Sequence, residues 1–317
     1  MLSQLSRVTI SQSLRHILSK VPPASFAADK TPKGGCGYSS NRRYLSTYYD
    51  SQSGLHLPVH DDSEIRLFLD VRTNSEPYVP HRLSKDRLEA DEVTEALQGL
   101  VQKGIHGLIL PQIRFPRDVR NLHTLSVIAP SGFCVLTDTS ETTSDSDMID
   151  EGLLQAKEAS STATNFSKIL EYRNNDEEGC RVTLQQSTDK GLHTTLSVGE
   201  EIYAGEGGDG EPITLANNIA AMIDASGGCD YIWISANKEE NKTATVADIM
   251  AQVCEELMYL DVAGATIKSR LLVDALKEDM VEDIMFAGVN KYVIDNEDQA
   301  ELVDTVAKEQ GKTLLRL

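Results

Sequence analysis

Short apolar runs of strand length alternate with amphipathic segments along this 317-residue chain, and this alternation limits the fold more than any other feature. The pattern is clearest near the C-terminus. Apolar runs at 231–235, 271–274, 291–294 and 313–317 alternate there with segments of helical period at 213–224, 245–260, 276–287 and 297–309. Strands and helices in strict alternation predict a parallel sheet with right-handed crossovers.

The N-terminal half repeats the pattern with strands expected at Ile65–Val71, Gly107–Leu110 and Phe133–Thr137, and helices near 90–103 and 116–122. Gly104 and Gly288 begin similar stretches, each expected to end one helix before the next strand enters the sheet. The part predicted to fold, 63–317, is close to the roughly 250 residues of a (β/α)₈ barrel. We therefore predict an α/β fold, a TIM-like barrel that is either complete or incomplete and decorated.

The middle of the chain is less regular. Residues 138–180 are rich in serine, threonine and acids, which predicts a solvated insertion containing a helix at 148–160. Arg181–Leu184 and His193–Val198 are consistent with a hairpin that is appended to the barrel or completes it. The sequence leaves open how many strands lie between 170 and 212, and hence whether the barrel closes with eight strands.

The first 45 residues differ in character from the rest. They contain seven basic residues, many serines and one acid, with an apolar helical stripe at Ile10, Leu14, Ile17 and Leu18. The segment Arg42–Ser46 resembles a site cut by mitochondrial processing peptidase. We predict a mitochondrial presequence over 1–45 and a location in the matrix, with a plastid address as the main alternative. A polar linker is expected at 46–62, ahead of the barrel at 63–317.

Charge, hydropathy and cysteine spacing count against several classes of partner and site. Seven of the 30 basic residues and one of the 49 acids lie in 1–45, so the remainder carries about −25. Such a chain repels nucleic acid, because attraction to phosphates dominates that binding. No apolar stretch reaches the 18 residues expected of a membrane span. Widely spaced cysteines without a C-x-x-C pair give a structural zinc site little support.

Aspartates follow four of the predicted strands. Barrel active sites gather where the strands open into loops, so Asp70, Asp138, Asp274 and Asp295 are the candidate catalytic residues. Carboxylates of this kind bind Mg²⁺, with Asp70 and Asp295 as the expected ligands, or act as general bases. The candidate groups for a substrate carboxylate or phosphate are Arg72, Gln112, Arg114 and Asn237. The alternative is that these aspartates are ordinary helix caps, as the acids after Asp295 also indicate.

Residues 250–317 resemble part of the barrel of pyridoxal-phosphate-dependent ornithine and diaminopimelate decarboxylases. The matching text is CEEL from Cys254, SRLLV from Ser269, GVNKYVIDNE from Gly288 and AKEQGKTLLRL from Ala307. The resemblance implies a pyridoxal phosphate site. The family's cofactor lysine has no exact counterpart, and Lys238 lies one position beyond it. The family's phosphate-binding glycines and second β domain are also missing, so an incomplete active site is expected.

A second, shorter stretch at about 104–120, with the text GLILPQIRFPRDVR from Gly107, is similar to a segment of citrate lyase beta-subunit-like barrels. That resemblance implies Mg²⁺-dependent chemistry on acyl-CoA thioesters. Gln112 stands where that family has a lysine. Sequence patterns that all such barrels share explain both resemblances equally well.

Three functional hypotheses follow. The first is a mitochondrial barrel protein, catalytically degenerate, with a regulatory or structural role as a homo-oligomer or as a subunit of a mitochondrial complex. The second is a Mg²⁺-dependent lyase or aldolase acting on a small anionic or acyl-CoA substrate. The third is a decarboxylase-like protein that binds pyridoxal phosphate through Lys238. The sequence alone leaves open whether the protein is an active enzyme.

Overall fold

The structure is a computed structural model. It describes residues 47–50, 55–58, 64–72, 98–113, 122–139 with gaps at 124, 128 and 130–131, 146–159, 165–173, 176–204, 211–236, 244–262 and 265–315. The chain divides into two compact units, 1–59 and 60–317. In the first, β1 (Thr47–Asp50) pairs antiparallel with β2 (Leu55–Pro58), within the range predicted to be a linker.

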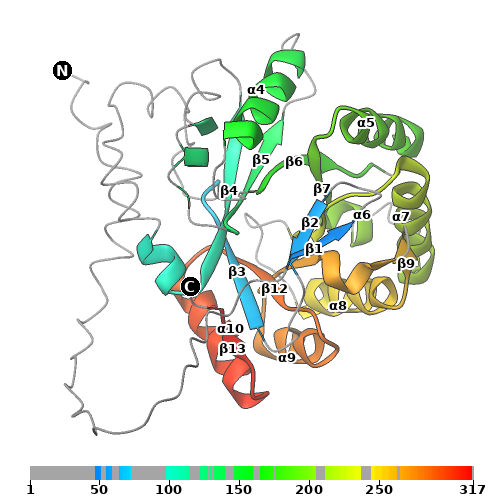
Figure 1. The fold of residues 1–317 in the computed structure, drawn as a ribbon. Helices are drawn as coiled ribbons and strands as arrows, with labels where there is room; N and C mark the ends of the chain where they lie inside the picture. The colour runs from blue at the N-terminus through cyan, green and yellow to red at the C-terminus, as the bar shows by residue number, and fades with distance from the viewer. Residues whose placement is uncertain are drawn as a thin grey trace, which may run out of the picture. The chain divides into compact units, whose positions relative to one another are not determined.

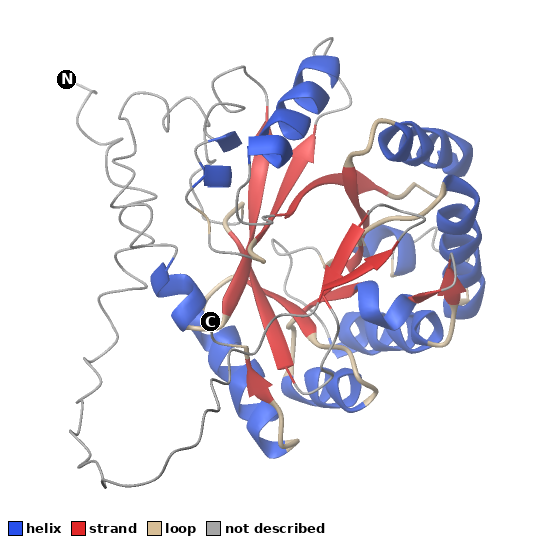
Figure 2. Ribbon diagram, viewed as in Figure 1, coloured by secondary structure: helices blue, strands red, loops and turns tan. Residues whose placement is uncertain are grey.

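A closed parallel barrel forms the second unit, as Figures 1 and 2 show. Eight of the described strands close it, in the order β3 (Glu64–Asp70), β4 (Ile105–Ile113), β5 (Cys134–Thr139), β6 (Asn165–Glu171), β7 (His193–Val198), β8 (Tyr231–Ile234), β11 (Leu271–Asp274) and β12 (Lys291–Ile294). The ring closes where β12 pairs with β3, from Lys291 beside Arg66 to Ile294 beside Leu69. The predicted TIM-like fold is confirmed.

Helices surround the ring in Figure 2. The described ones of ordinary length are α4 (Ser146–Ala159), α5 (Glu177–Asp189), α7 (Pro212–Ser226), α8 (Ala244–Met258), α9 (Glu278–Phe286) and α10 (Glu297–Glu309). Gly104 and Gly288 precede their strands with φ of 85° and 105°, a conformation that favours glycine. Among the described residues, no helix combines the length and apolar character that crossing a bilayer requires.

Two predictions for the middle of the chain are wrong. Arg181–Leu184 belongs to α5, which begins after the N-cap Asp176, and β7 runs parallel to its neighbours, so there is no hairpin. The range predicted as a solvated insertion includes β6, a strand of the barrel whose central residues are buried. The helix expected at 148–160 is confirmed as α4.

The last predicted strand is shorter than expected and lies outside the ring. β13 (Thr313–Leu314) pairs with the first two residues of β3, and the Leu315 amide donates to the Ile65 carbonyl at 2.8 Å. Two short strands, β9 (Asp261–Val262) and β10 (Ala265–Thr266), form a separate pair that precedes the 3₁₀ turn η3 (Ile267–Arg270). β13 and Leu315 thus lie against the strand that begins the barrel.

Alternate residues of the strands fill the interior. A buried cluster contains Phe68, Ile109, Cys134, Leu136, Ile169, Tyr231, Trp233, Leu272 and Val293. The rings of Phe68 and Tyr231 meet edge to face, with centroids 5.7 Å apart. Gly107 leaves room for Phe68, since a Cβ there would lie 2.3 Å from its ring. The barrel is therefore a packed core, and a ligand has access only at an end.

Polar side chains close the N-terminal end of the barrel. His193 Nδ1 lies 3.0 Å from Asp230 Oδ2, and Lys291 Nζ donates to the Ser269 carbonyl at 2.7 Å. His106 Nε2 lies 2.7 Å from the carbonyl oxygen of Leu315 and joins β4 to the residue after β13. Burial lowers the pKa of His106, and the backbone bond to Leu315 only partly offsets that effect. The neutral imidazole therefore donates this bond.

His106 predicts a loss of stability in acid. Its folded-state pKa lies below the ordinary 6.5, so the unfolded chain takes up the proton first as pH falls. The stabilisation is complete above about pH 6.5 and is lost below it, by at most about 1.4 kcal/mol per pH unit. Urea unfolding between pH 8 and pH 5 measures this slope. His106→Gln, which keeps a donor for Leu315, should flatten it, whereas His123→Gln at an exposed histidine should not. Equal slopes in both variants would contradict the assignment.

Candidate functional site

A cavity of about 200 Å³ opens at the C-terminal end of the barrel. Its described lining comes from the ends of β3, β6, β7 and β8 and from the turn α6 (Glu200–Tyr203), and consists of Arg72, Glu171, Ser197, Gly199, Glu200, Glu201, Ser235 and Ala236. We call the space that these residues line the mouth cavity. The space is smaller than the roughly 300–1,000 Å³ of sites for drug-sized ligands. It suits a small metabolite.

Arg72 is held in a fixed orientation at the mouth cavity. Its Nε and Nη2 each donate to Asp70 at 3.1 Å, one to each carboxylate oxygen, and its backbone amide donates to Asp70 Oδ1 at 2.9 Å. The Asp70 side chain is fully buried, whereas the Arg72 side chain keeps 27% of its surface exposed. Two parallel charged bonds of this kind are geometrically specific. Asp70 therefore positions a guanidinium that remains partly accessible.

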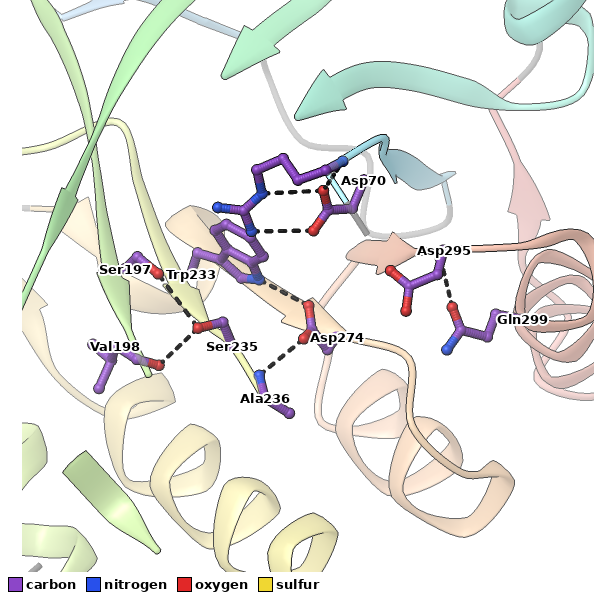
Figure 3. Close-up of polar contacts among 10 residues, drawn as sticks. Asp70, Ser197, Val198, Trp233, Ser235, Ala236, Asp274, Asp295 and Gln299 are labelled. Atoms are coloured by element: carbon purple, nitrogen blue, oxygen red, sulfur yellow. Dashed lines mark hydrogen bonds and ion pairs between the residues drawn. The ribbon is translucent and has the colours of Figure 1, made fainter. Parts of the chain in front are cut away.

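Trp233 supports the same guanidinium from the barrel interior. The Arg72 Cζ lies 4.7 Å from the centre of the indole ring, a cation–π contact. Figure 3 shows the indole nitrogen pointing to Asp274, with Nε1 donating to Oδ1 at 2.9 Å. The other Asp274 oxygen accepts from the Ala236 amide, also at 2.9 Å. A continuous chain of contacts thus runs from Asp274 through Trp233 to Arg72 and Asp70.

Two serine hydroxyls lie beside this chain of contacts. Ser197 Oγ and Ser235 Oγ are 3.4 Å apart, and Ser235 Oγ donates to the Val198 carbonyl at 3.3 Å (Figure 3). The Ser235 carbonyl accepts from Tyr203 Oη at 2.8 Å, which ties α6 to the end of β8. Burial, and then the charge of Asp274, raise the pKa of Tyr203 well above its ordinary value. The phenol therefore stays protonated and keeps its bond.

Gly199 lets α6 bring its acids to the cavity. A Cβ at Gly199 would lie 2.3 Å from a carboxylate oxygen of Glu201, so the absence of a side chain lets that carboxylate fold back over the backbone. Glu171 enters from the end of β6 and forms an exposed ion pair with Arg173 at 3.4 Å. The described mouth cavity therefore combines one arginine, two hydroxyls and three glutamates.

The structure places three of the predicted site residues in this chain of contacts, Asp70, Arg72 and Asp274. Asp295 follows β12, and its backbone amide donates to Gln299 Oε1 at 2.6 Å, while the next residue, Asn296, caps α10. The cap of α10 is therefore Asn296, one residue after the aspartate for which capping was the alternative interpretation. Among the described residues, no group of three histidines, cysteines or acids is placed to hold a metal ion. Of the two predicted Mg²⁺ ligands, Asp70 is engaged by Arg72.

The other predicted site residues cannot be placed. Lys238, Asn237 and Arg114 lie outside the described residues. Asp138 belongs to β5 and Gln112 to β4, but their side chains are not described.

Several residues of the site were missed by the sequence reasoning. Trp233 lies in the predicted apolar run at 231–235 and is fully buried, but its ring also contacts the guanidinium of Arg72. Glu171 lay in the range interpreted as an insertion, and α6 was not predicted. The signal that would have found α6 is a glycine and two glutamates, Gly199 to Glu201, directly after the predicted strand at 193–198.

No protein-family model matches the chain, and no curated protein matches its sequence. Similarity to solved structures exists at low identity. A hydroxymethylglutaryl-CoA lyase from Pseudomonas aeruginosa is 10% identical with a TM-score of 0.44, over 74% of this chain and 76% of that one. A dihydrodipicolinate synthase from Rhodopseudomonas palustris is 10% identical with a TM-score of 0.47, over 79% and 77%. A fructose-bisphosphate aldolase from Campylobacter jejuni is 12% identical with a TM-score of 0.42, over 75% and 73%. At this level the likeness concerns the barrel fold, which the strand order establishes independently.

Proposed function

We propose that this protein is a barrel that binds a small anionic compound in the mouth cavity, with Arg72 as the group that receives the anion. The observation that carries the proposal is the guanidinium fixed by Asp70 and supported by Trp233 at the edge of a cavity. An arginine oriented in advance spends little entropy on binding, and a guanidinium has five N–H donors, of which Asp70 engages one at Nε and one at Nη2.

We further propose a regulatory or structural role, in the mitochondrial matrix, over a catalytic one. Two of the four aspartates expected to be catalytic, Asp70 and Asp274, direct their carboxylates at groups of the protein itself. Such contacts support a scaffold that orients Arg72. Lys238 as a pyridoxal phosphate lysine stays a prediction.

A lyase or aldolase is the second candidate. What favours it is that Glu171, Glu200 and Glu201 share a cavity with the proposed anion site, where a carboxylate can remove a proton from a bound compound. The fold admits this chemistry, since barrel enzymes place their catalytic groups at this end. Solvent-deuterium exchange into a bound compound, lost in Glu200→Gln/Glu201→Gln, would support it. Binding without exchange would favour the first candidate.

The single tryptophan of the chain lies in the site, so its fluorescence reports binding directly. Titration with inorganic phosphate, L-lactate, L-alanine and succinate should change the emission of Trp233 for at least one of them. Arg72→Lys, which keeps the charge but loses the fork, should weaken that binding at least tenfold, or about 1.4 kcal/mol.

The matched control is Arg181→Lys, because Arg181 forms a similar two-bond ion pair with Glu178 on exposed α5, away from the mouth cavity. The control should bind as the wild type does. The proposal fails if none of the four compounds binds by fluorescence or calorimetry, or if Arg72→Lys leaves every affinity unchanged.

A further inference from the structure

The charges around the mouth cavity are unequal. Arg72 is the cation of the described lining, and the buried carboxylate of Asp70 already balances it. Three glutamates face the same space, and of these Glu171 also pairs with the exposed Arg173. A ligand that carries only negative charge therefore gains at Arg72 and is opposed by the rest of the lining.

The turn α6, which carries Glu200 and Glu201, is tied to the end of β8. Tyr203 fixes the end of α6 to the Ser235 carbonyl, and the bare backbone at Gly199 receives the carboxylate of Glu201. The carboxylates of Glu200 and Glu201 line the cavity and attract a positive group there, although Glu201 is exposed. Ser197 and Ser235 add hydroxyl oxygens in the same cavity, and these accept hydrogen bonds from N–H donors.

We infer that the compound bound in the mouth cavity is a small zwitterion, with a carboxylate on Arg72 and an ammonium group directed to the serine hydroxyls and the glutamates of α6. This inference rests on the proposed function and specifies its ligand class. The cavity of about 200 Å³ suits compounds of amino-acid size. Phosphate and dicarboxylates are disfavoured, because their second charge lacks a described cation in the lining.

Small carboxylates that differ in their second polar group separate the contributions of the carboxylate and the ammonium group. L-Alanine and L-lactate differ only in an ammonium or hydroxyl group beside the same carboxylate, and succinate replaces the cation with a second anion. Calorimetry and Trp233 fluorescence at low ionic strength should give L-alanine an affinity at least about tenfold higher than L-lactate, with succinate weakest. Raising the salt concentration should narrow the difference, since exposed charges are screened.

Glu200→Gln/Glu201→Gln removes the two charges of α6 and keeps the side-chain size. In this variant the preference for L-alanine should fall to less than about threefold, while the affinity for L-lactate is maintained or rises. The matched control is Glu255→Gln/Glu256→Gln on α8, an adjacent pair of glutamates outside the mouth cavity, which should keep the full preference.

Each result has one meaning. Equal or tighter binding of L-lactate or succinate by the wild type would overturn the zwitterion inference and leave the anion site at Arg72 standing. A preference for L-alanine that survives in Glu200→Gln/Glu201→Gln would also overturn it. Binding of no compound, inorganic phosphate included, would instead refute the proposed function.

Discussion

Trp233→Ala is expected to destabilise the protein by about 4 kcal/mol, which lowers the apparent Tm by about 10 °C, and to abolish anion binding. The indole is fully buried in the barrel cluster, so its removal leaves a large cavity. It also takes the hydrogen-bond donor from Asp274 and the supporting ring from Arg72. Circular dichroism and calorimetry measure these effects, since the variant has no tryptophan to report by fluorescence.

Trp233→Phe separates packing from hydrogen bonding. The phenyl ring keeps most of the packing and a face for Arg72, but Asp274 Oδ1 loses the indole N–H. We expect a cost of about 1–3 kcal/mol and weakened, measurable anion binding. If Trp233→Phe is as unstable as Trp233→Ala, the bond to Asp274 matters more than the volume of the ring. If Trp233→Ala binds anions normally, the ring does not support the site.

Arg72→Met is expected to lower stability by about 3 kcal/mol and to remove ligand binding. Asp70 is a fully buried carboxylate that receives two charged hydrogen bonds from Arg72, and burying such a charge without its cation is costly. Methionine is a flexible apolar side chain that can still cover Trp233, so the loss reports mainly the charge. Denaturant unfolding of the variant against wild type measures it.

A double-mutant cycle with Asp70→Asn tests the assignment. Asparagine at position 70 removes the buried charge, so it should recover about half of the stability lost in Arg72→Met while leaving binding absent. As a single change, Asp70→Asn should weaken anion binding, because the guanidinium of Arg72 is no longer fixed. Additive stability effects of the two changes would show that Asp70 and Arg72 do not interact, contrary to the ion pair.

The C-terminal elements were predicted closely for a clear physical reason. β11 and β12 each contain three consecutive apolar residues, as expected of parallel strands buried on both faces, and they match the predicted bounds at 271–274 and 291–294. α10 begins at Glu297 as predicted, since Asn296 provides a side-chain cap and two acids fill the first turn.

The middle of the barrel was missed because its polar residues are satisfied by distant partners. In β6, Ser167 meets Thr195 at 2.7 Å, and Lys168 pairs with Asp150 at 3.1 Å, so a buried strand reads as a polar segment. Along α5, the described buried residues are Leu184 and Ser187, which gives little amphipathic signal. These pairings exist only after folding.

For the candidate site, the sequence predicted several of the residues but not their interactions. Asp70, Arg72 and Asp274 were predicted because a polar residue after an apolar strand is visible in the sequence. Their roles were not predicted, because Trp233 meets Arg72 across the barrel and Asp274 on the neighbouring strand, and both partners are far from it in the chain. The four-aspartate hypothesis treated as free acids two carboxylates that bind the protein itself.

The pairing of β3 with both β12 and β13 also limits the order in which the barrel can fold. β3 is made first among the barrel strands, but its partners on one side arrive last, and His106 contacts Leu315 across 209 positions. Until β12 and β13 have been synthesised, the edge of β3 that pairs with them is available to wrong partners. Ring closure therefore requires that β12 is available to pair with β3. Loss of the few residues around β13 would weaken the seam that holds the first strand in place.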